Sequence, residues 1–230
     1  MCGRFSLKTP PEEIMNHFGL ATQPPWQPRY NLAPTQDVGI VRVEDDKARA
    51  FHIARWGLVP AGGPGPDHGP ALINARSETA HVKSPFRLAL EHRRCLIPAD
   101  GFYEWRRRDR WRQPYRIELG DGTLLAFAGL WDEWRAQAGD RILSCTILTT
   151  DANQLVAPIH ERMPVLVSPI DYDRWLSDTH AASDIVDLLR PFPASAMRVF
   201  PVSDRVNSVK HDDPECARRV PEPLELDLFS

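Results

Sequence analysis

Two stretches in the middle of the chain, TLLAFAGLW (residues 123–131) and ILSCTILTT (142–150), decide the fold class. Both are mostly apolar, which predicts buried β-strands. Further strands are predicted at DVGIVRV (37–43), RAFHIARWGLV (49–59), MPVLV (163–167) and MRVFPVS (197–203). Helices fall between the strands without a strict β-α-β alternation. We therefore expect an α+β fold: a single domain with an antiparallel, barrel-like β core and peripheral helices.

Helices are predicted where capping residues or prolines come before an apolar pattern. In TPPEEIMNHFG (9–19), Thr9 is the expected N-cap and Gly19 lies past the end. Ile14 and Phe18 are spaced to form one apolar face. Further helices are expected after Ser84-Pro85, after Asp151 in ANQLVAPI (152–159), after Ser168-Pro169 and from Ser183.

Length and composition are those of an ordinary globular protein. The 230 residues are 42% hydrophobic and 26% charged, and the net charge is −3. Such a chain has no global basic signature, so any nucleic-acid site must be a local basic face. No composition shift or internal repeat divides the chain. We expect one domain over residues 1–220 and a C-terminal tail over 221–230.

The cysteines indicate a reducing compartment rather than a disulfide framework. Cys2, Cys95, Cys145 and Cys216 form no C-x-x-C pair, and the chain start lacks a signal-peptide pattern. No apolar run approaches the ~18 residues of a membrane span. Pro164 stands where an H-E-x-x-H zinc motif needs its second histidine. We expect free thiols, a cytoplasmic protein with no membrane contact, and neither metal nor cofactor.

Cys2 has unusual chemistry once Met1 is removed, because its α-amine and its thiol then lie on adjacent carbons. The α-amine has a reference pKa of about 7.7–8.0, and the thiol one of about 8.5. The thiol could attack an acyl group, or the amine could condense with an aldehyde. The two could also act in turn, an imine closing to a thiazolidine. The alternative, an unremarkable chain terminus, stays open at this point.

Three further segments place one polar residue among apolar or aromatic neighbours. LINARSET (72–79) contains Asn74, CLIPADGFYEW (95–105) contains Glu104, and APIHERMP (157–164) contains His160. Such surroundings shift pKa values and suit acid–base chemistry. Taken singly, such a residue more often has a structural role, as a hydrogen-bonded surface or core side chain.

Seven segments in order resemble the motifs of the SOS response-associated peptidase (SRAP) family. They are MCGRF (1–5), YNLAPTQ (30–36), RWGLVP (55–60), INARSET (73–79), RRCLIPADGFYEW (93–105), PIHERMP (158–164) and DDPEC (212–216). The resemblance runs from Cys2 to Cys216, nearly the whole chain. It implies the SRAP fold.

The resemblance also implies a function. The family is known as a sensor of abasic sites in single-stranded DNA, crosslinking its N-terminal cysteine to the ring-opened sugar as a thiazolidine. The family pattern falls on Cys2, Asn74, Glu104 and His160, all present here. Crosslink reversal and autoprocessing peptidase activity are further implied activities. The expected partner is single-stranded DNA containing abasic sites, bound by a monomer that is nucleoid-associated when on DNA.

DNA contacts are expected from residues beside these motifs. Arg4, Arg76 and Arg162 each neighbour a proposed site residue and are expected to bind phosphates. Trp56 could stack on a base, or pack in the core. The basic run RRRDRWR (106–112) could follow DNA, or form a solvated hairpin.

One segment departs from the family pattern. After RWGLVP the family has a second tryptophan, whereas Pro60 is followed here by a glycine- and proline-rich stretch, PAGGPGPDHGP (60–70). This loop is either a surface connection or a flexible wall beside a site. The departure puts one aromatic DNA contact in doubt.

Two rival functions remain from the sequence. Glutamine amidotransferases with an N-terminal nucleophile also begin Met-Cys-Gly, but they need an oxyanion hole and a glutamine pocket, for which no separate motif is found. A plain single-strand binding module, with Cys2 incidental, is the other.

Overall fold

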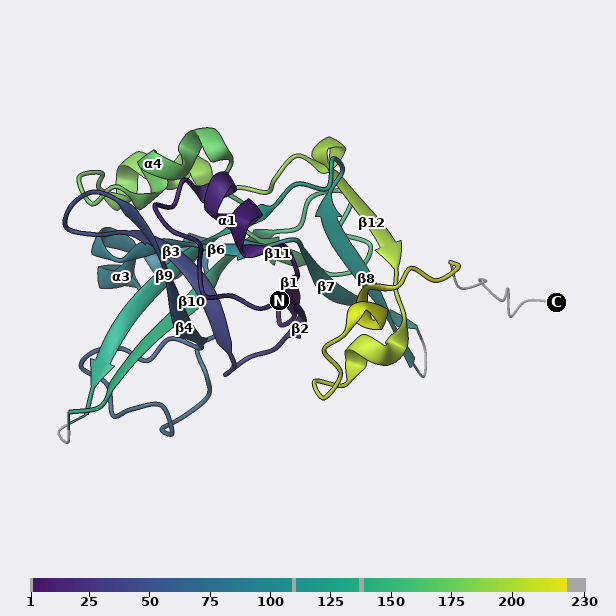
Figure 1. The fold of residues 1–230 in the computed structure, drawn as a ribbon, viewed down its shortest axis with the longest axis horizontal. Helices are drawn as coiled ribbons and strands as arrows, with labels where there is room; N and C mark the ends of the chain where they lie inside the picture. Colours follow the sequence, from purple (N-terminus) through teal and green to yellow (C-terminus); the bar gives the residue numbers. More distant parts are fainter. Residues whose placement is uncertain (1, 109–110, 137–138, 223–230) are drawn as a thin grey trace.

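Five strands close into a barrel that forms one end of the molecule (Figure 1). The structure is a computed structural model and describes residues 2–108, 111–136 and 139–222. The barrel strands pair in the order β10-β4-β3-β6-β9, and pairing of β9 with β10 closes the ring. Their bounds are β3 (Asp37–Val43), β4 (Arg49–Trp56), β6 (Arg94–Ala99), β9 (Leu125–Arg135) and β10 (Arg141–Asp151). The expected α+β fold with a barrel-like core is confirmed.

The barrel is antiparallel except where β10 meets β4. Ser144 of β10 pairs with Arg55 of β4 in parallel register, and the short β5 (Asn74–Arg76) pairs with β10 in the same sense. A parallel pair needs a long connection, and the chain between β4 and β10 supplies one. The antiparallel core expected from the sequence is confirmed at the other barrel pairings, and the β10–β4 pair is the exception to it. β11 (Arg162–Pro164) extends the sheet along β10.

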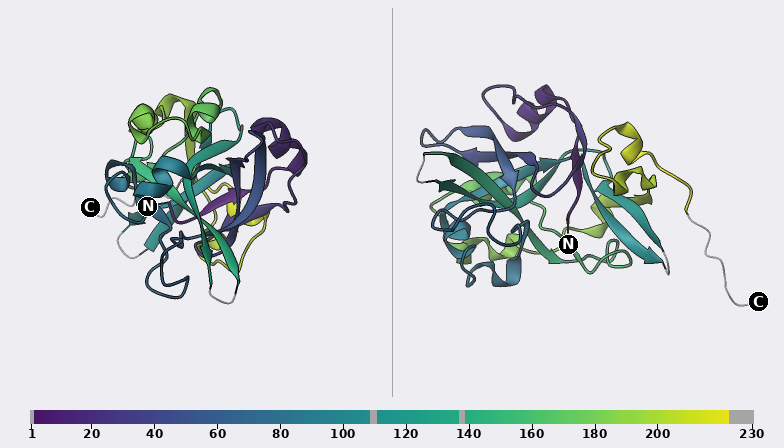
Figure 2. Two further views of the ribbon diagram at one scale, coloured as in Figure 1. Left: turned by 90° about the vertical axis from the view of Figure 1, so that its left-hand side faces the viewer. Right: turned by 90° about the horizontal axis from the view of Figure 1, so that it is seen from below.

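A second, five-stranded antiparallel sheet lies beside the barrel, with strand order β12-β8-β7-β1-β2. Its strands are β1 (Phe5–Leu7), β2 (Arg29–Leu32), β7 (Gly101–Arg108), β8 (Trp111–Leu119) and β12 (Met197–Pro201). β1 is an interior strand, between β7 and β2. The described N-terminal end therefore lies where the two sheets meet, rather than at an outer edge (Figure 2).

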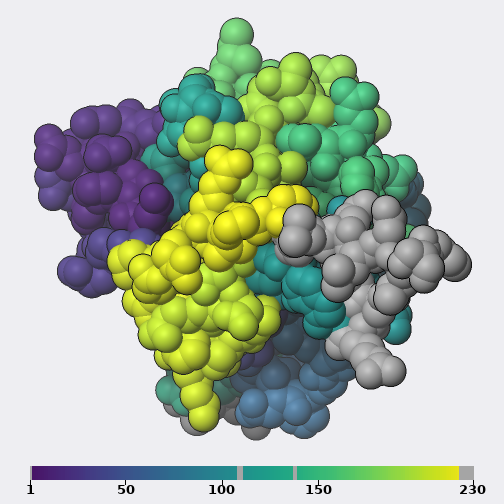
Figure 3. Space-filling model, turned by 90° about the vertical axis from the view of Figure 1, so that its right-hand side faces the viewer, coloured from purple at the N-terminus to yellow at the C-terminus, as the bar shows by residue number. Residues whose placement is uncertain are grey.

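Helices are short and peripheral. They are α1 (Pro11–Phe18), α2 (Ser77–Ala80), α3 (Arg87–His92), α4 (Tyr172–Leu176) and the 3₁₀ turns η1 (Pro169–Asp171), η2 (Ala182–Leu188), η3 (Ala194–Ala196), η4 (Asp204–Asn207) and η5 (Pro214–Ala217). Figure 3 shows the C-terminal segments after β12 gathered on one surface of the molecule. Within the described ranges, no helix has the length and apolarity needed to cross a bilayer.

Two local expectations about helices are wrong. Pro10, not Thr9, occupies the N-cap of α1, while the Thr9 backbone N–H donates to Asp100. Residues 152–159 form turns rather than a helix, because Asp151 still belongs to β10 and its carboxylate pairs with Arg162. The Asn153 side chain accepts the hydrogen bonds that organise the turn.

One aromatic cluster joins the barrel to the second sheet. The Phe5 ring lies 5.1 Å from the Trp56 ring and 5.5 Å from the Phe127 ring, and Phe102 lies 6.1 Å from Phe127, each in edge-to-face geometry. Edge-to-face pairs add stabilisation beyond the buried area. Because one strand of the second sheet contributes Phe5 to the barrel core, the two sheets form a single domain. The expected boundary at residue 220 stays a prediction, since most of the tail (223–230) lies outside the described residues.

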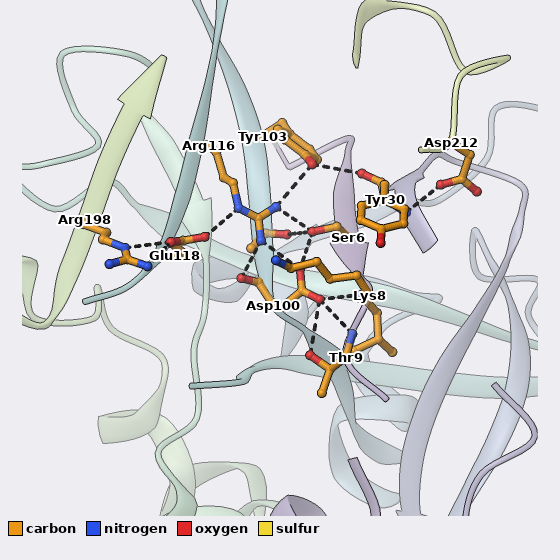
Figure 4. A network of polar contacts seen from close by, with 12 residues as sticks. Ser6, Lys8, Thr9, Tyr30, Asp100, Tyr103, Arg116, Glu118, Arg198 and Asp212 are labelled. Carbon is orange, nitrogen blue, oxygen red and sulfur yellow. Dashed lines mark hydrogen bonds and ion pairs between the residues drawn. The ribbon is translucent and has the colours of Figure 1, made fainter. Parts of the chain in front are cut away.

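A buried polar network anchors β1 on its other face (Figure 4). The Arg116 guanidinium donates to Ser6 Oγ at 2.7 Å, to Asp100 Oδ1 at 2.8 Å and to Glu118 Oε2 at 2.6 Å. Asp100 in turn accepts from Ser6 Oγ and from the Lys8 backbone N–H, both at 2.5 Å. The network holds the end of β1 opposite to Cys2 in a fixed position, which limits how far Cys2 can move.

Candidate functional site

Cys2 lies at the junction of the two sheets, fully buried. Its Sγ is 3.9 Å from the Arg4 carbonyl oxygen, and its own carbonyl oxygen accepts a hydrogen bond of 2.8 Å from Asn74 Nδ2. Burial raises the pKa of the Cys2 thiol far above its ordinary value, and the negative charge of Glu104 raises it further. The resting sulfur is therefore a neutral thiol rather than a thiolate.

Asn74 reaches Cys2 from the barrel. It is the first residue of β5 and pairs with Ile147 of β10, so the barrel seam fixes its backbone. Its Nδ2 is committed to Cys2, whereas its Oδ1 is buried with no hydrogen-bond partner within the described part of the chain. A buried acceptor without a partner costs free energy, and a ligand hydroxyl or amine would relieve that cost.

Glu104 lies on β7, the strand next to the N-terminal segment, and is 4% exposed. Burial raises the pKa of Glu104, and the charge of His160 opposes part of that rise. A carboxyl group with a raised pKa exchanges protons closer to neutral pH, which suits general acid–base chemistry.

His160 lies in the turn before β11, half-buried. Its Nδ1 accepts a hydrogen bond of 2.9 Å from the Arg162 backbone N–H. The Arg162 carbonyl oxygen also lies 3.2 Å from this Nδ1. The shorter contact is to a backbone N–H, which can only donate, so it favours the neutral tautomer with its proton on Nε2. His160 is thus set to donate from Nε2. The fold brings the four predicted residues, which lie far apart in sequence, into one neighbourhood. Asn74 donates a hydrogen bond to the Cys2 carbonyl, and Glu104 acts electrostatically on the Cys2 thiol and is itself affected by the charge of His160.

The predicted DNA-contact residues differ in what they can reach. Arg76 is exposed at the end of β5. The Arg4 guanidinium is engaged by Asn31 Oδ1 at 2.8 Å and the Val206 carbonyl at 2.7 Å. Trp56 is fully buried, with its Nε1 donating to the Ile73 carbonyl, so core packing describes it and base stacking does not.

Among these arginines, Arg162 is the one whose guanidinium is most fully occupied by ion pairs within the protein. It is 7% exposed and pairs with Glu78 at 2.8 Å and Asp151 at 2.7 Å. In this state its guanidinium holds β11 against β10 and α2, and no phosphate can reach it without displacing a carboxylate. Sequence reasoning missed these partners, although Glu78 lies inside the INARSET segment.

The glycine- and proline-rich loop is packed against the barrel. A bridge between Leu58 and Leu72 joins its two ends, and Trp134 Nε1 donates to the Gly63 carbonyl at 3.0 Å. The Trp134 ring also lies 3.1 Å from where a Cβ would stand at Gly65, whose φ of +113° favours glycine. The loop leads directly into Asn74, so its packing bears on the site.

The expected free thiols are confirmed, since all four cysteines are unbridged and buried. Over the described ranges, no cluster of three or more His, Cys, Asp or Glu residues is arranged to hold a metal ion.

Comparison with known proteins decides the family. The family model described as SOS response associated peptidase (SRAP) matches residues 1–209. The chain belongs to the SRAP family. The abasic site processing protein YoqW of Bacillus subtilis (strain 168) is 39% identical to this SRAP chain over 220 residues, covering 94% of the chain and 98% of YoqW. The abasic site processing protein HMCES of Gallus gallus is 32% identical, covering 86% of the chain and 70% of HMCES.

Solved structures agree on the fold. A crystal structure of a protein from Bacteroides thetaiotaomicron superposes with a TM-score of 0.85 at 24% identity, covering 95% of this SRAP chain and 100% of that protein. A second, from Bordetella bronchiseptica, has a TM-score of 0.77 at 33% identity and covers 88% and 100%. The resemblance to the SRAP family stated from the motifs is confirmed.

Proposed function

We propose that this SRAP protein processes abasic sites in single-stranded DNA by crosslinking Cys2, after Met1 removal, to the ring-opened sugar. The observation that supports it most is the Asn74 hydrogen bond to the Cys2 carbonyl, together with the electrostatic coupling of the buried Glu104 to the Cys2 thiol and to His160. Relatives named as abasic site processing proteins support the substrate. The crosslink would shield the lesion from strand cleavage.

The first step opens the sugar. An abasic deoxyribose is a cyclic hemiacetal, and opening it breaks the bond between C1 and the ring oxygen. His160 donates its Nε2 proton to that oxygen, as the Nδ1 hydrogen bond from Arg162 prepares it to do. The proton of the C1 hydroxyl leaves to a base, and the product is an aldehyde.

The second step joins protein to DNA without any outside reactant. The Cys2 amine attacks the aldehyde carbon, and Glu104 protonates the carbinolamine hydroxyl, which leaves as water. Loss of water leaves an iminium and the Glu104 carboxylate. The thiol sulfur then bonds to the iminium carbon, and the thiol proton passes to Glu104, which restores its carboxyl group. Because burial and Glu104 keep the thiol neutral, the amine acts first and the sulfur second.

Asn74 and the surrounding arginines position the reactants. The Asn74 hydrogen bond fixes the Cys2 backbone, and its open Oδ1 can accept from the amine or a sugar hydroxyl. Holding amine and aldehyde together replaces a slow bimolecular step. Exposed Arg76 is proposed as a phosphate contact, and Arg4 and Arg162 become contacts only if DNA displaces their present partners.

Further properties belong to the same proposal. Reversal of the crosslink would use Glu104 in the opposite direction. Peptidase activity would be confined to exposing Cys2. A monomer acting in the cytoplasm, nucleoid-associated on DNA, is the simplest setting for this reaction.

Intact-mass spectrometry with single-stranded DNA carrying one abasic site tests the proposal. Wild type should give an adduct at the summed mass less one water, stable without borohydride. Without borohydride, Cys2→Ala should give none. Cys2→Ser keeps the amine but lacks sulfur, so it should give an adduct only when borohydride traps the imine. Cys216→Ala, which alters a buried thiol elsewhere, is the matched control and should react like wild type.

Absence of an adduct in wild type with Met1 removed would exclude crosslinking. Glutamine and peptide substrates would then test the amidotransferase alternative, and affinity for undamaged single strands would test the plain binding module.

A further inference from the structure

A cavity opens near the site, beside β7, and Trp105, the residue after Glu104, contributes to its lining. Its volume is about 520 Å³, and its lining residues are Arg4, Trp105, Trp111, Arg112, Asp204 and Asn207. Cavities of a few hundred Å³ accommodate small planar ligands. The catalytic scheme above uses none of this surface except Arg4.

Two indole rings line the cavity, one held by a hydrogen bond and the other about half exposed to solvent. Trp105 is fixed, because its Nε1 donates to Asn207 Oδ1 at 2.7 Å and the Arg4 guanidinium lies 5.7 Å from its ring centre. Trp111, at the start of β8, is 49% exposed. A tryptophan that exposed, on a hairpin strand beside an arginine, is unlike the buried Trp56 and Trp175 of the core. Exposed indoles beside cations are what stacking on nucleobases requires.

The charges around the cavity suit a nucleotide, with a carboxylate available to its base and a guanidinium to its phosphate. Asp204 brings a carboxylate to the lining, which repels phosphate oxygens and can accept from a base amino group. Arg112 lies on the same lining, where it can meet the backbone phosphate attached to that base.

The cavity lies close enough to Cys2 to hold the nucleotide next to the abasic site. Arg4 is two residues from Cys2, at most about 7 Å of extended backbone. Trp105 directly follows Glu104, and consecutive strand residues point to opposite faces. A base held at Trp105 and Trp111 is therefore kept away from the abasic sugar at Glu104, which leaves the aldehyde open to the amine.

We infer that this cavity binds the nucleobase adjacent to the abasic site, stacked on Trp111, with Arg112 on its phosphate. The inference deepens the proposed function and rests on it. It also assigns a role to Trp111 and Arg112 of the RRRDRWR run (106–112), for which the sequence left DNA binding and a solvated hairpin both open; residues 109 and 110 of that run lie outside the described residues.

Binding to oligonucleotides with a tetrahydrofuran analogue of the abasic site tests this, because the analogue has no aldehyde and cannot crosslink. Three substrates are compared: one with bases on both sides of the analogue, one with a baseless spacer on the 5′ side, and one with it on the 3′ side. Wild type should lose affinity by about tenfold for one of the two spacers. Trp111→Ala should bind the strand with bases on both sides about tenfold more weakly than wild type does. It should show no further loss of affinity on the spacer strand to which wild type is sensitive.

Trp111→Phe keeps a stacking ring and should behave nearly as wild type. Ile170→Ala removes another exposed apolar side chain, remote in sequence, and should change no affinity. Equal spacer penalties in wild type and Trp111→Ala would overturn the inference. If wild type neither binds these strands nor crosslinks to an abasic one, the proposed function fails, and the inference fails with it. If wild type crosslinks to an abasic strand but binds all three analogue strands equally well, only the inference about the cavity is overturned and the proposed function stands.

Discussion

Asp100 and Glu104 are two buried carboxylates on neighbouring stretches of one chain segment, and their surroundings differ. Asp100 accepts hydrogen bonds from Ser6, Lys8 and Arg116, so its charge is matched by donors. Glu104 lies where burial dominates, and its pKa is raised. The difference separates anchoring from chemistry: one carboxylate locks β1 in place, while the other is kept ready to exchange a proton.

Replacing Arg116, which joins the buried polar network that anchors β1, should have the largest effect, and that effect is on the unfolding free energy. Arg116→Met leaves Asp100 and Glu118 buried without their counter-charge, and breaking such a pair costs about 3–5 kcal/mol of unfolding free energy. Denaturant unfolding measures it. Arg205→Ala, which breaks the exposed pair with Asp213, is the control and should leave the midpoint nearly unchanged. A loss below about 1 kcal/mol for Arg116→Met would mean that the network contributes little net stability.

Changing Glu104 should affect chemistry rather than the fold. Glu104→Gln keeps the shape but cannot exchange protons, so the crosslinking rate should fall by about 10²–10⁴. Single-turnover mass spectrometry measures the rate. An unchanged rate would remove Glu104 from the mechanism.

Glu104 also predicts a pH dependence of stability. Its folded pKa lies above its unfolded value, so the folded state holds more protons. Its stabilising contribution is complete below the unfolded pKa and is lost as pH rises through the folded pKa. Unfolding of Glu104→Gln across that window should lack this loss. If wild type and variant have parallel pH profiles, the pKa of Glu104 is not raised.

Sequence motifs predicted the fold class correctly, because it depends on local patterns. The site residues that they named stay predictions, although the structure links Asn74 to Cys2 by a hydrogen bond. The motifs did not reach the parallel seam between β4 and β10, since strand sense depends on a long connection. They also did not show that Trp56 is buried or that Arg162 is occupied by Glu78 and Asp151. Those facts depend on partners distant in sequence, which no local pattern encodes.

A smaller effect is expected at Asn74. Asn74→Ala removes the hydrogen bond to the Cys2 carbonyl, so the crosslinking rate should fall by about tenfold while unfolding free energy changes by about 1 kcal/mol. Rate and denaturation measurements separate the two. A stability loss as large as that of Arg116→Met would place Asn74 with the anchor instead of the site.

The smallest effect is expected at exposed Arg76. Arg76→Ala should weaken single-strand binding a few-fold and reduce the slope of log affinity against log salt by about 0.7, the value for one phosphate on a single strand. Titrations at several salt concentrations measure the slope. Arg55→Ala, at another arginine of a barrel strand, is the comparison. Equal slopes in wild type and Arg76→Ala would exclude a phosphate contact there.

The interior position of β1 has a consequence for biosynthesis. Cys2 is translated directly after Met1, whereas β7, the strand that pairs with β1, is complete at Arg108 only much later in translation. At about 5–20 residues per second, a ribosome needs on the order of 5–20 s to cover that distance. During this interval the N-terminal end has no β7 to pack against, and an aminopeptidase can reach it. In the proposed function, Met1 can therefore be removed on the nascent chain, before folding encloses Cys2.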